Sequence, residues 1–203
     1  GPQKSYVTPT GLCVHSPKLG LTMFLKGPDW KVVCYIAKNK SYVTCSHKEW
    51  AEKFVGPIGA RDAEKAARSK MSTEIADQLK KGVTPKVGAT VTKGISVGGS
   101  STICGRKAVQ FFMVGAERFP PYDKNLEFWV VPNLNLKPPV IQAISEVGGF
   151  PAGVGLPIEL YRHMPRGKKL TQYKTLNIEQ VLVDDSIFSL PKGFTLAPDE
   201  MAL

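Results

Sequence analysis

Short runs of alternating apolar and polar residues, each closed by turn-forming residues, constrain this chain more than any other feature. They are clearest in the last third, where Leu156, Ile158 and Leu160 alternate with other residues at the period of a half-buried strand. Residues 165–167 supply turn chemistry before a second extended run over residues 170–183. This pattern indicates antiparallel sheet with short connections.

The rest of the chain has the same strand-and-turn pattern. Residues 1–11 have few apolar anchors, and we expect a flexible N-terminal arm there. Residues 98–101 are expected to be a flexible turn. The runs at 103–114 and 126–131 are apolar on both faces, which predicts a sheet covered on both sides. The expected strands are residues 12–15, 21–26, 30–36, 42–45, 87–97, 103–114, 126–131 and 156–160.

Helical signals interrupt the strands, and no internal repeat stands out. Ser46 lies three residues before Glu49, which is capping-box spacing and predicts a helix from about 47 to 54. Residues 61–81 are rich in Ala, Lys and Glu, with a narrow apolar stripe of Met71, Ile75 and Leu79. A short helix is expected at 140–147. The length predicts a single domain, residues 12–203, with a helical insertion at about 47–82.

The chain is basic, with 27 Lys and Arg against 17 Asp and Glu and a formal charge of +10. This balance favours anionic partners such as lipid head groups, but the charges are dispersed, so we expect no specific nucleic-acid binding. No apolar run reaches membrane-spanning length. The leading Gly1-Pro2 resembles a protease scar, so we expect that a native signal peptide was removed.

The four cysteines lack zinc-binding spacing, but one pair suits a disulfide. If Asn39-Lys40 is a two-residue turn, Cys34 faces Cys45 on the neighbouring strand, at a separation that a disulfide spans. The alternative is two reduced thiols that fill a core face. A disulfide would favour a location outside the cytoplasm. The histidines also lack metal-binding partners, and we expect no metal or cofactor.

Residues 94–98 match the Gly-x-Ser-x-Gly elbow of serine hydrolases, and Asp123 and His163 follow Ser96 in the required order. An elbow needs a helix immediately after the serine, whereas the following residues are poor helix formers that lead into a strand. A hydrolase is therefore a minor alternative, and we expect a protein without enzymatic activity.

A cluster of basic residues marks the turn between the last two expected strands. It could bind the phosphates of lipid or nucleic acid, or it could be the solvated tip of a hairpin. Its members are Arg162, His163, Arg166, Lys168, Lys169 and Lys174.

The closing phrase of residues 183–194, VDDSIFSLPKGF, resembles the end of bacterial proteins with the outer-membrane lipoprotein-carrier (LolA/LolB-like) fold, closest to relatives of unknown function. The strand at 127–130 and the Leu156-Pro157-Ile158 strand opening look similar, so the resemblance covers roughly residues 103–194. It implies an α+β fold: a curved antiparallel β-sheet, an incomplete barrel, with helices across its concave face. It also implies an apolar cavity that receives acyl chains, and a periplasmic or secreted protein.

Together, the strands and the resemblance favour non-enzymatic binding or transport of an apolar or amphiphilic ligand, such as a lipid or a lipoprotein acyl chain. Basic residues at the rim, Arg162, Arg166, Lys168 and Lys169, would meet an anionic head group. The alternative is a structural module with a filled core that binds a partner protein of the envelope. The expected cavity lining is Phe111, Met113, Trp129, Val131, Leu156, Ile158 and Leu160.

Overall fold

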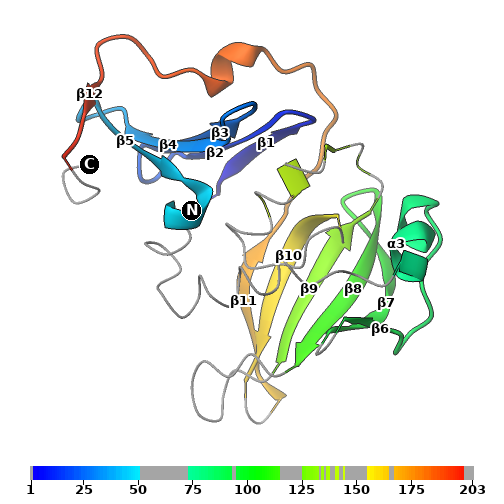
Figure 1. The fold of residues 1–203 in the computed structure, drawn as a ribbon. Helices are drawn as coiled ribbons and strands as arrows, with labels where there is room; N and C mark the ends of the chain where they lie inside the picture. The colour runs from blue at the N-terminus through cyan, green and yellow to red at the C-terminus, as the bar shows by residue number, and fades with distance from the viewer. Residues whose placement is uncertain are drawn as a thin grey trace.

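The computed structural model of the chain describes residues 2–50, 73–92, 95–114, 125–132, 134, 136–137, 140–141, 144, 155–164 and 167–198. The strands in these ranges form two six-stranded sheets. The first sheet lies at the upper left of Figure 1 and the second at the lower right. In the first sheet the strand order is β1-β2-β3-β4-β5-β12, and in the second it is β11-β10-β9-β8-β7-β6.

The first sheet is built mainly from a β-meander with a regular ten-residue spacing. Strands β2 to β5 each have six residues, and each is separated from the next by a four-residue turn. The last residue of each turn, Gly20, Trp30 or Lys40, has a positive φ of 63°, 53° or 50°. This ten-residue repeat is not evident in the sequence, because three unlike residues occupy the last position of the turns. The strands are β1 (Lys4–Thr8), β2 (Gly11–Ser16), β3 (Leu21–Lys26), β4 (Lys31–Ile36), β5 (Ser41–Ser46) and β12 (Thr195–Leu196).

The ends of the described chain both belong to the first sheet. Residues 4–8, expected in a flexible arm, instead form β1 and pair with β2 over their whole length. Alternation explains this, because Tyr6 and Val7 pack against apolar clusters on different faces of the sheet. At the other edge, β12 pairs with β5 in parallel.

The predicted capping box after β5 is confirmed. The Glu49 backbone N–H donates to Ser46 Oγ at 3.1 Å, and the Ser46 backbone N–H donates to Glu49 Oε2 at 2.7 Å. Residues 47–50 are helical, and the remainder of the helix expected to 54 lies outside the described residues. These two bonds satisfy donors that the first turn of a helix leaves without partners.

The second sheet is antiparallel throughout, and its turns differ from those expected. Gly98 to Ser101, expected to be a turn, lie inside β7, and the chain reverses at Cys104 and Gly105, whose φ values are 49° and 71°. The run expected to extend to 183 leaves the sheet at Lys174. The strands are β6 (Thr90–Thr92), β7 (Ile95–Ile103), β8 (Arg106–Val114), β9 (Asn125–Val131), β10 (Leu156–His163) and β11 (Lys169–Lys174).

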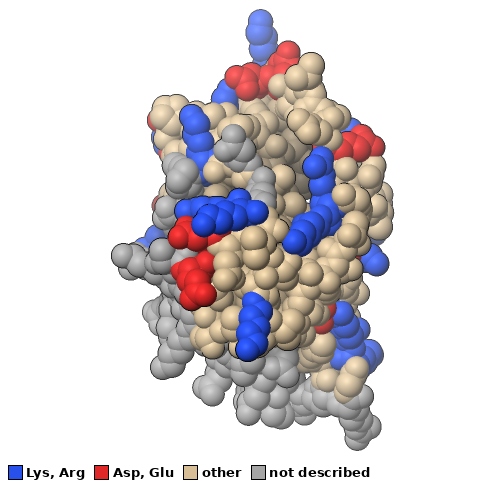
Figure 2. Space-filling view, turned by 90° about the vertical axis from the view of Figure 1, so that its right-hand side faces the viewer, with Lys and Arg blue, Asp and Glu red and all other residues tan. Residues whose placement is uncertain are grey.

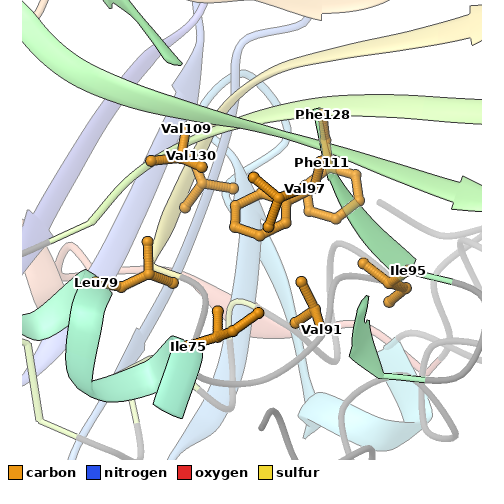
Figure 3. Packing of buried hydrophobic residues seen from close by; sticks show 9 residues of the cluster. All are labelled: Ile75, Leu79, Val91, Ile95, Val97, Val109, Phe111, Phe128 and Val130. Atoms are coloured by element: carbon orange, nitrogen blue, oxygen red, sulfur yellow. The ribbon is translucent and has the colours of Figure 1, made fainter. Parts of the chain in front are cut away.

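Helix α3 (Thr73–Lys80) packs two residues against one face of the second sheet. Its Ile75 and Leu79 point toward the sheet, as the predicted stripe requires, while Met71 lies outside the described residues (Figure 3). Beneath them Phe111 and Phe128 stack with ring centroids 5.4 Å apart. The core consists of Ile75, Leu79, Val91, Ile95, Val97, Val109, Phe111, Phe128 and Val130.

The prediction of one curved sheet, an incomplete barrel with helices across its concave face, is wrong. The described strands are divided between two sheets, and α3 lies beside β6 and β7 (Figure 1). The physical reason is that each group of strands has apolar residues enough for a core of its own. Where the structure describes the chain, it is mostly β rather than α+β.

The segments that follow β9 and β11 also link the two sheets. Leu134 packs in a cluster on the second sheet, whereas Leu136, Val140 and Ile144 pack on the first, and Leu156 of β10 joins both clusters. The C-terminal segment, orange to red in Figure 1, runs from β11 through the 3-10 helix η2 (Asp185–Phe188) to β12. Residues 140, 141 and 144 are helical, as expected for the helix at 140–147, whose other residues are not described.

Candidate functional site

The second sheet has a face opposite α3 on which polar side chains gather. Successive residues of a strand point to opposite faces, so Phe128 joins the α3 core while Glu127 and Trp129 lie on the other side. We call this side the polar face. Its described members include Gln110 and Phe112 of β8, Glu127 and Trp129 of β9, Glu159, Tyr161 and His163 of β10, and Lys169, Thr171 and Lys174 of β11.

The Glu127 carboxylate is the centre of the polar face, with a side chain only 4% exposed. Its Oε1 accepts hydrogen bonds from Gln110 Nε2, Trp129 Nε1 and Lys169 Nζ, each at 2.9 Å. Its Oε2 lies 2.7 Å from His163 Nε2. The donors come from four adjacent strands, and we call these five residues the Glu127 network.

The network keeps Glu127 ionised. Burial raises the pKa of this carboxyl group, but hydrogen bonds from Lys169, Gln110, His163 and Trp129 outweigh that effect. The pKa therefore falls from 4.5 to about 2. A buried carboxylate with this many donors remains anionic at neutral pH and fixes the positions of the side chains around it.

A second acidic group extends the polar face along β10. The Tyr161 hydroxyl donates to Glu159 Oε2 at 2.6 Å, and both residues are buried. Burial, followed by the bond to Glu159, raises the pKa of Tyr161. The Lys169 ammonium lies 3.8 Å from the centroid of the Tyr161 ring, a cation–π distance. Lys169 is thereby held between an aromatic ring and the Glu127 carboxylate.

Two cationic or ionisable members of the network remain accessible. The side chains of His163 and Lys169 are 34% and 42% exposed, although each is bonded to Glu127. The Phe112 ring stands edge-on to His163 with centroids 6.2 Å apart. The polar face thus combines buried, fixed hydrogen bonds with partly exposed donors and aromatic rings. Among the residues that the structure describes, no three His, Cys, Asp or Glu side chains are grouped to hold a metal.

The structure divides the seven predicted cavity-lining residues between the two faces of the second sheet. Phe111, Met113 and Leu160 pack in the α3 core. Trp129, Val131, Leu156 and Ile158 pack on the opposite side, with Ala108, Leu134 and Ile178. One sheet–helix cavity therefore cannot collect all seven. Ile158 changes face relative to simple alternation because the β9–β10 register shifts between Pro157 and Glu159.

The predicted head-group residues are also separated. Lys169 belongs to the Glu127 network, and Lys168 is exposed beside it. Arg162 pairs with Leu126 on β9 and points to the opposite face from Tyr161 and His163. Arg166 lies outside the described residues.

The geometry of Ser96 does not match a nucleophile elbow. Ser96 lies inside β7, paired with Phe112, and the strand continues to Ile103 where an elbow would have a helix. His163 is on β10, three strands away, which is roughly 14 Å at normal strand spacing. Asp123 is outside the described residues.

The register on which the disulfide was predicted is wrong. The β4–β5 turn has four residues, so Cys34 pairs with Val43 and Cys45 with Val32. Cys34 and Cys45 become diagonal neighbours, at about 7–8 Å between Cα atoms, a separation too long for an unstrained disulfide. All four thiols are free in the structure, and burial, followed by the proximity of Cys45, raises the pKa of Cys34 to about 12.

Gly98 gives the network room, and we expect Gly98→Ala to destabilise the protein by about 2 kcal/mol. A Cβ at this position would lie 2.4 Å from Phe112 Cε2 and 2.6 Å from Gln110 Oε1, so both side chains must shift. Gly99→Ala is the matched control, since its nearest neighbour is Gln110 Oε1 at 3.8 Å. Urea unfolding of both variants tests this, and equal stabilities would contradict it.

Prediction from the sequence included Trp129, His163 and Lys169 for other reasons but missed Glu127 and Gln110, although one signal for Glu127 was present. The residues of β9 other than its first, LEFWVV, are apolar apart from Glu127. A single charge in a strand covered on both faces must find partners, because burying an unpaired charge costs several kcal/mol. The signal would have identified Glu127 but not its donors.

Comparisons with known proteins add little. No protein-family model and no curated protein matches the chain. A solved structure with some likeness is the crystal structure of an uncharacterized conserved protein from Thermus thermophilus, at 10% identity and a TM-score of 0.38. The match covers 92% of this chain and 80% of that chain, and its TM-score is too low to support a conclusion. The resemblance to lipoprotein carriers stays a prediction.

Within the described ranges, no helix is both long and apolar enough to cross a membrane.

Proposed function

We propose that this protein binds an amphiphilic ligand with an anionic head group on the polar face of the second sheet, without catalysing a reaction. The Glu127 network carries the proposal. It fixes Lys169 and His163 while leaving 42% and 34% of their side chains exposed. Donors that are already fixed bind an anion with a smaller entropy cost than mobile surface side chains do. The net charge of +10 favours the same class of ligand.

An apolar surface for the rest of the ligand lies on the same face. Phe112 adjoins His163, and Trp129 donates to Glu127. Trp129 and Leu156 are half-buried over the cluster of Ala108, Val131 and Ile158. The proposal therefore places an acyl chain opposite α3, and Phe111, Met113 and Leu160 are ordinary core. A location in the periplasm or outside the cell stays a prediction.

Native mass spectrometry with oleate tests the proposal, with oleyl alcohol as a probe of the same chain but without the charge. We expect one oleate per protein and weaker binding of the alcohol. Lys169→Met removes the ammonium group and should weaken oleate binding about tenfold, the effect of roughly one charge-assisted hydrogen bond. Lys81→Met is the control and should leave the affinity unchanged, because Lys81 is exposed directly after α3, on the opposite side of the sheet from the polar face.

Circular dichroism first establishes that both variants are folded. An unchanged protein mass with excess oleate would refute the proposal and favour the alternative of a protein-interaction module with a filled core. If oleate and oleyl alcohol bound equally well, the proposal of an apolar ligand would stand, but Lys169 would have no role in binding a head group.

A further inference from the structure

One end of the first sheet brings together three segments that are distant in sequence. The turns at 17–20 and 37–40 are joined by a hydrogen bond from Ala37 N to Gly20 O at 3.3 Å. The segment 191–195 joins them, because Thr195 N donates to Lys40 O at 2.9 Å. We call these three segments the lysine end. In Figure 1 it is the end of the first sheet at which β12 lies.

Every charged side chain of the lysine end is a lysine. Lys18, Lys38, Lys40 and Lys192 are all exposed, and the three segments contain no Asp or Glu. At the opposite end of the same sheet the charges are mixed, with Lys26 paired to Asp185 at 2.8 Å. On the side of the molecule that Figure 2 shows, basic side chains are scattered and acidic ones lie among them.

Exposed leucines accompany these lysines. Leu19 stands at the tip of the first turn and is 63% exposed, and Leu196 on β12 is 61% exposed. An exposed leucine in a turn that also carries an exposed lysine is suited to a membrane interface, where apolar groups enter the acyl boundary and lysines meet phosphates.

We propose that the lysine end docks onto a membrane surface that contains anionic phospholipids. Each lysine near such a surface contributes roughly fivefold to affinity, so four contribute on the order of several hundredfold. The proposal uses residues of the first sheet only, so it goes beyond ligand binding on the polar face and does not depend on it.

The side chains favour lipid over nucleic acid. Nucleic-acid surfaces combine cations with aromatic side chains that stack on bases, and they favour arginine. The lysine end has no arginine. Its aromatic residue, Phe194, is half-buried and packs edge-on against Tyr35, with ring centroids 5.2 Å apart. An exposed leucine contributes nothing to phosphate binding but does contribute to a bilayer interface.

Vesicle co-sedimentation of the full chain tests the proposal. The vesicles contain phosphatidylcholine alone or phosphatidylcholine and phosphatidylglycerol at about 7:3. We expect binding to the anionic vesicles only, weakened by salt. The variant with Lys18, Lys38, Lys40 and Lys192 all changed to Gln should lose at least about tenfold in binding. The charge-matched control changes four exposed lysines elsewhere, Lys81, Lys86, Lys168 and Lys174, to Gln and should retain binding.

The Leu19→Ser variant distinguishes binding to a lipid surface from binding to other polyanions. It should weaken vesicle binding several-fold and leave binding to a single-stranded RNA of similar charge unchanged. Equal losses in the two quadruple variants would reduce the effect to net charge and overturn the proposal. The proposal would also be overturned if the protein did not bind anionic vesicles. It would be overturned as well if the protein bound RNA more strongly than vesicles and the lysine-end variant lost that RNA binding. Oleate binding is measured separately, and the variant with all four lysine-end residues changed to Gln should bind oleate as the wild type does.

Discussion

Replacing Glu127 with Gln is expected to lower the free energy of unfolding by about 3 kcal/mol, because one partner is removed from a buried charged network. Gln has nearly the same volume, so no cavity forms, but the negative charge is lost and one carboxylate oxygen becomes an amide donor. Lys169, His163, Gln110 and Trp129 then compete for a single acceptor oxygen. Urea unfolding measures the effect.

Glu159→Gln is the matched control for this substitution. Glu159 lies on the adjacent strand and is buried to a similar extent. The exposed fraction of the whole residue is 5%, against 3% for the whole of Glu127. It accepts a hydrogen bond from the neutral Tyr161 hydroxyl, which an amide oxygen can still accept. We expect a loss of about 1 kcal/mol or less. A Glu127→Gln variant no less stable than Glu159→Gln would show that the network contributes little stability.

Local patterns in the sequence predicted much of the secondary structure. The strand expected at 21–26 matches β3, Leu21–Lys26, and that at 126–131 matches β9 within one residue. The Ser46–Glu49 capping box and the stripe of Ile75 and Leu79 were also confirmed. Each of these features depends on residues within a few positions of one another. The period of the side chains and their hydrogen-bonding chemistry are therefore sufficient to predict it.

Long-range features were not predictable in the same way. The register of Cys34 depends on whether its turn has two or four residues, and Lys40 adopts a positive φ without being a glycine. Gly98 looked like a turn residue but sits at a register shift inside β7, where its missing side chain makes room for Phe112. In each case tertiary packing, rather than local preference, decided the outcome.

The Glu127 network shows the same difference between local features, which can be predicted from the sequence, and long-range ones, which cannot. Glu127 was identifiable as a lone charge in an apolar strand, but three of its four donors lie 17 residues before it and 36 and 42 residues after it. Alternation places each side chain on a face, and only the strand order β11-β10-β9-β8 brings those faces together. The predicted cavity lining failed for the same reason, because residues of similar character belong to opposite faces.

Acid is expected to remove about 3 kcal/mol of stability through Glu127 alone. Its pKa is about 2 in the folded protein against 4.5 as its ordinary value, so folding favours the ionised form. This contribution is complete above about pH 4.5 and is lost as the pH falls from there toward 2, at about 1.4 kcal/mol per unit of pKa difference.

Urea unfolding of the wild type and Glu127→Gln at several pH values between 6 and 2 isolates this contribution. The stability difference between them should shrink as the pH falls, because protonation of Glu127 in the wild type removes the charge that the variant already lacks. Asp184, whose pKa is also lowered, is common to both proteins and cancels. A difference that stays constant down to pH 2 would mean that packing, rather than the charge of Glu127, makes the network important for stability.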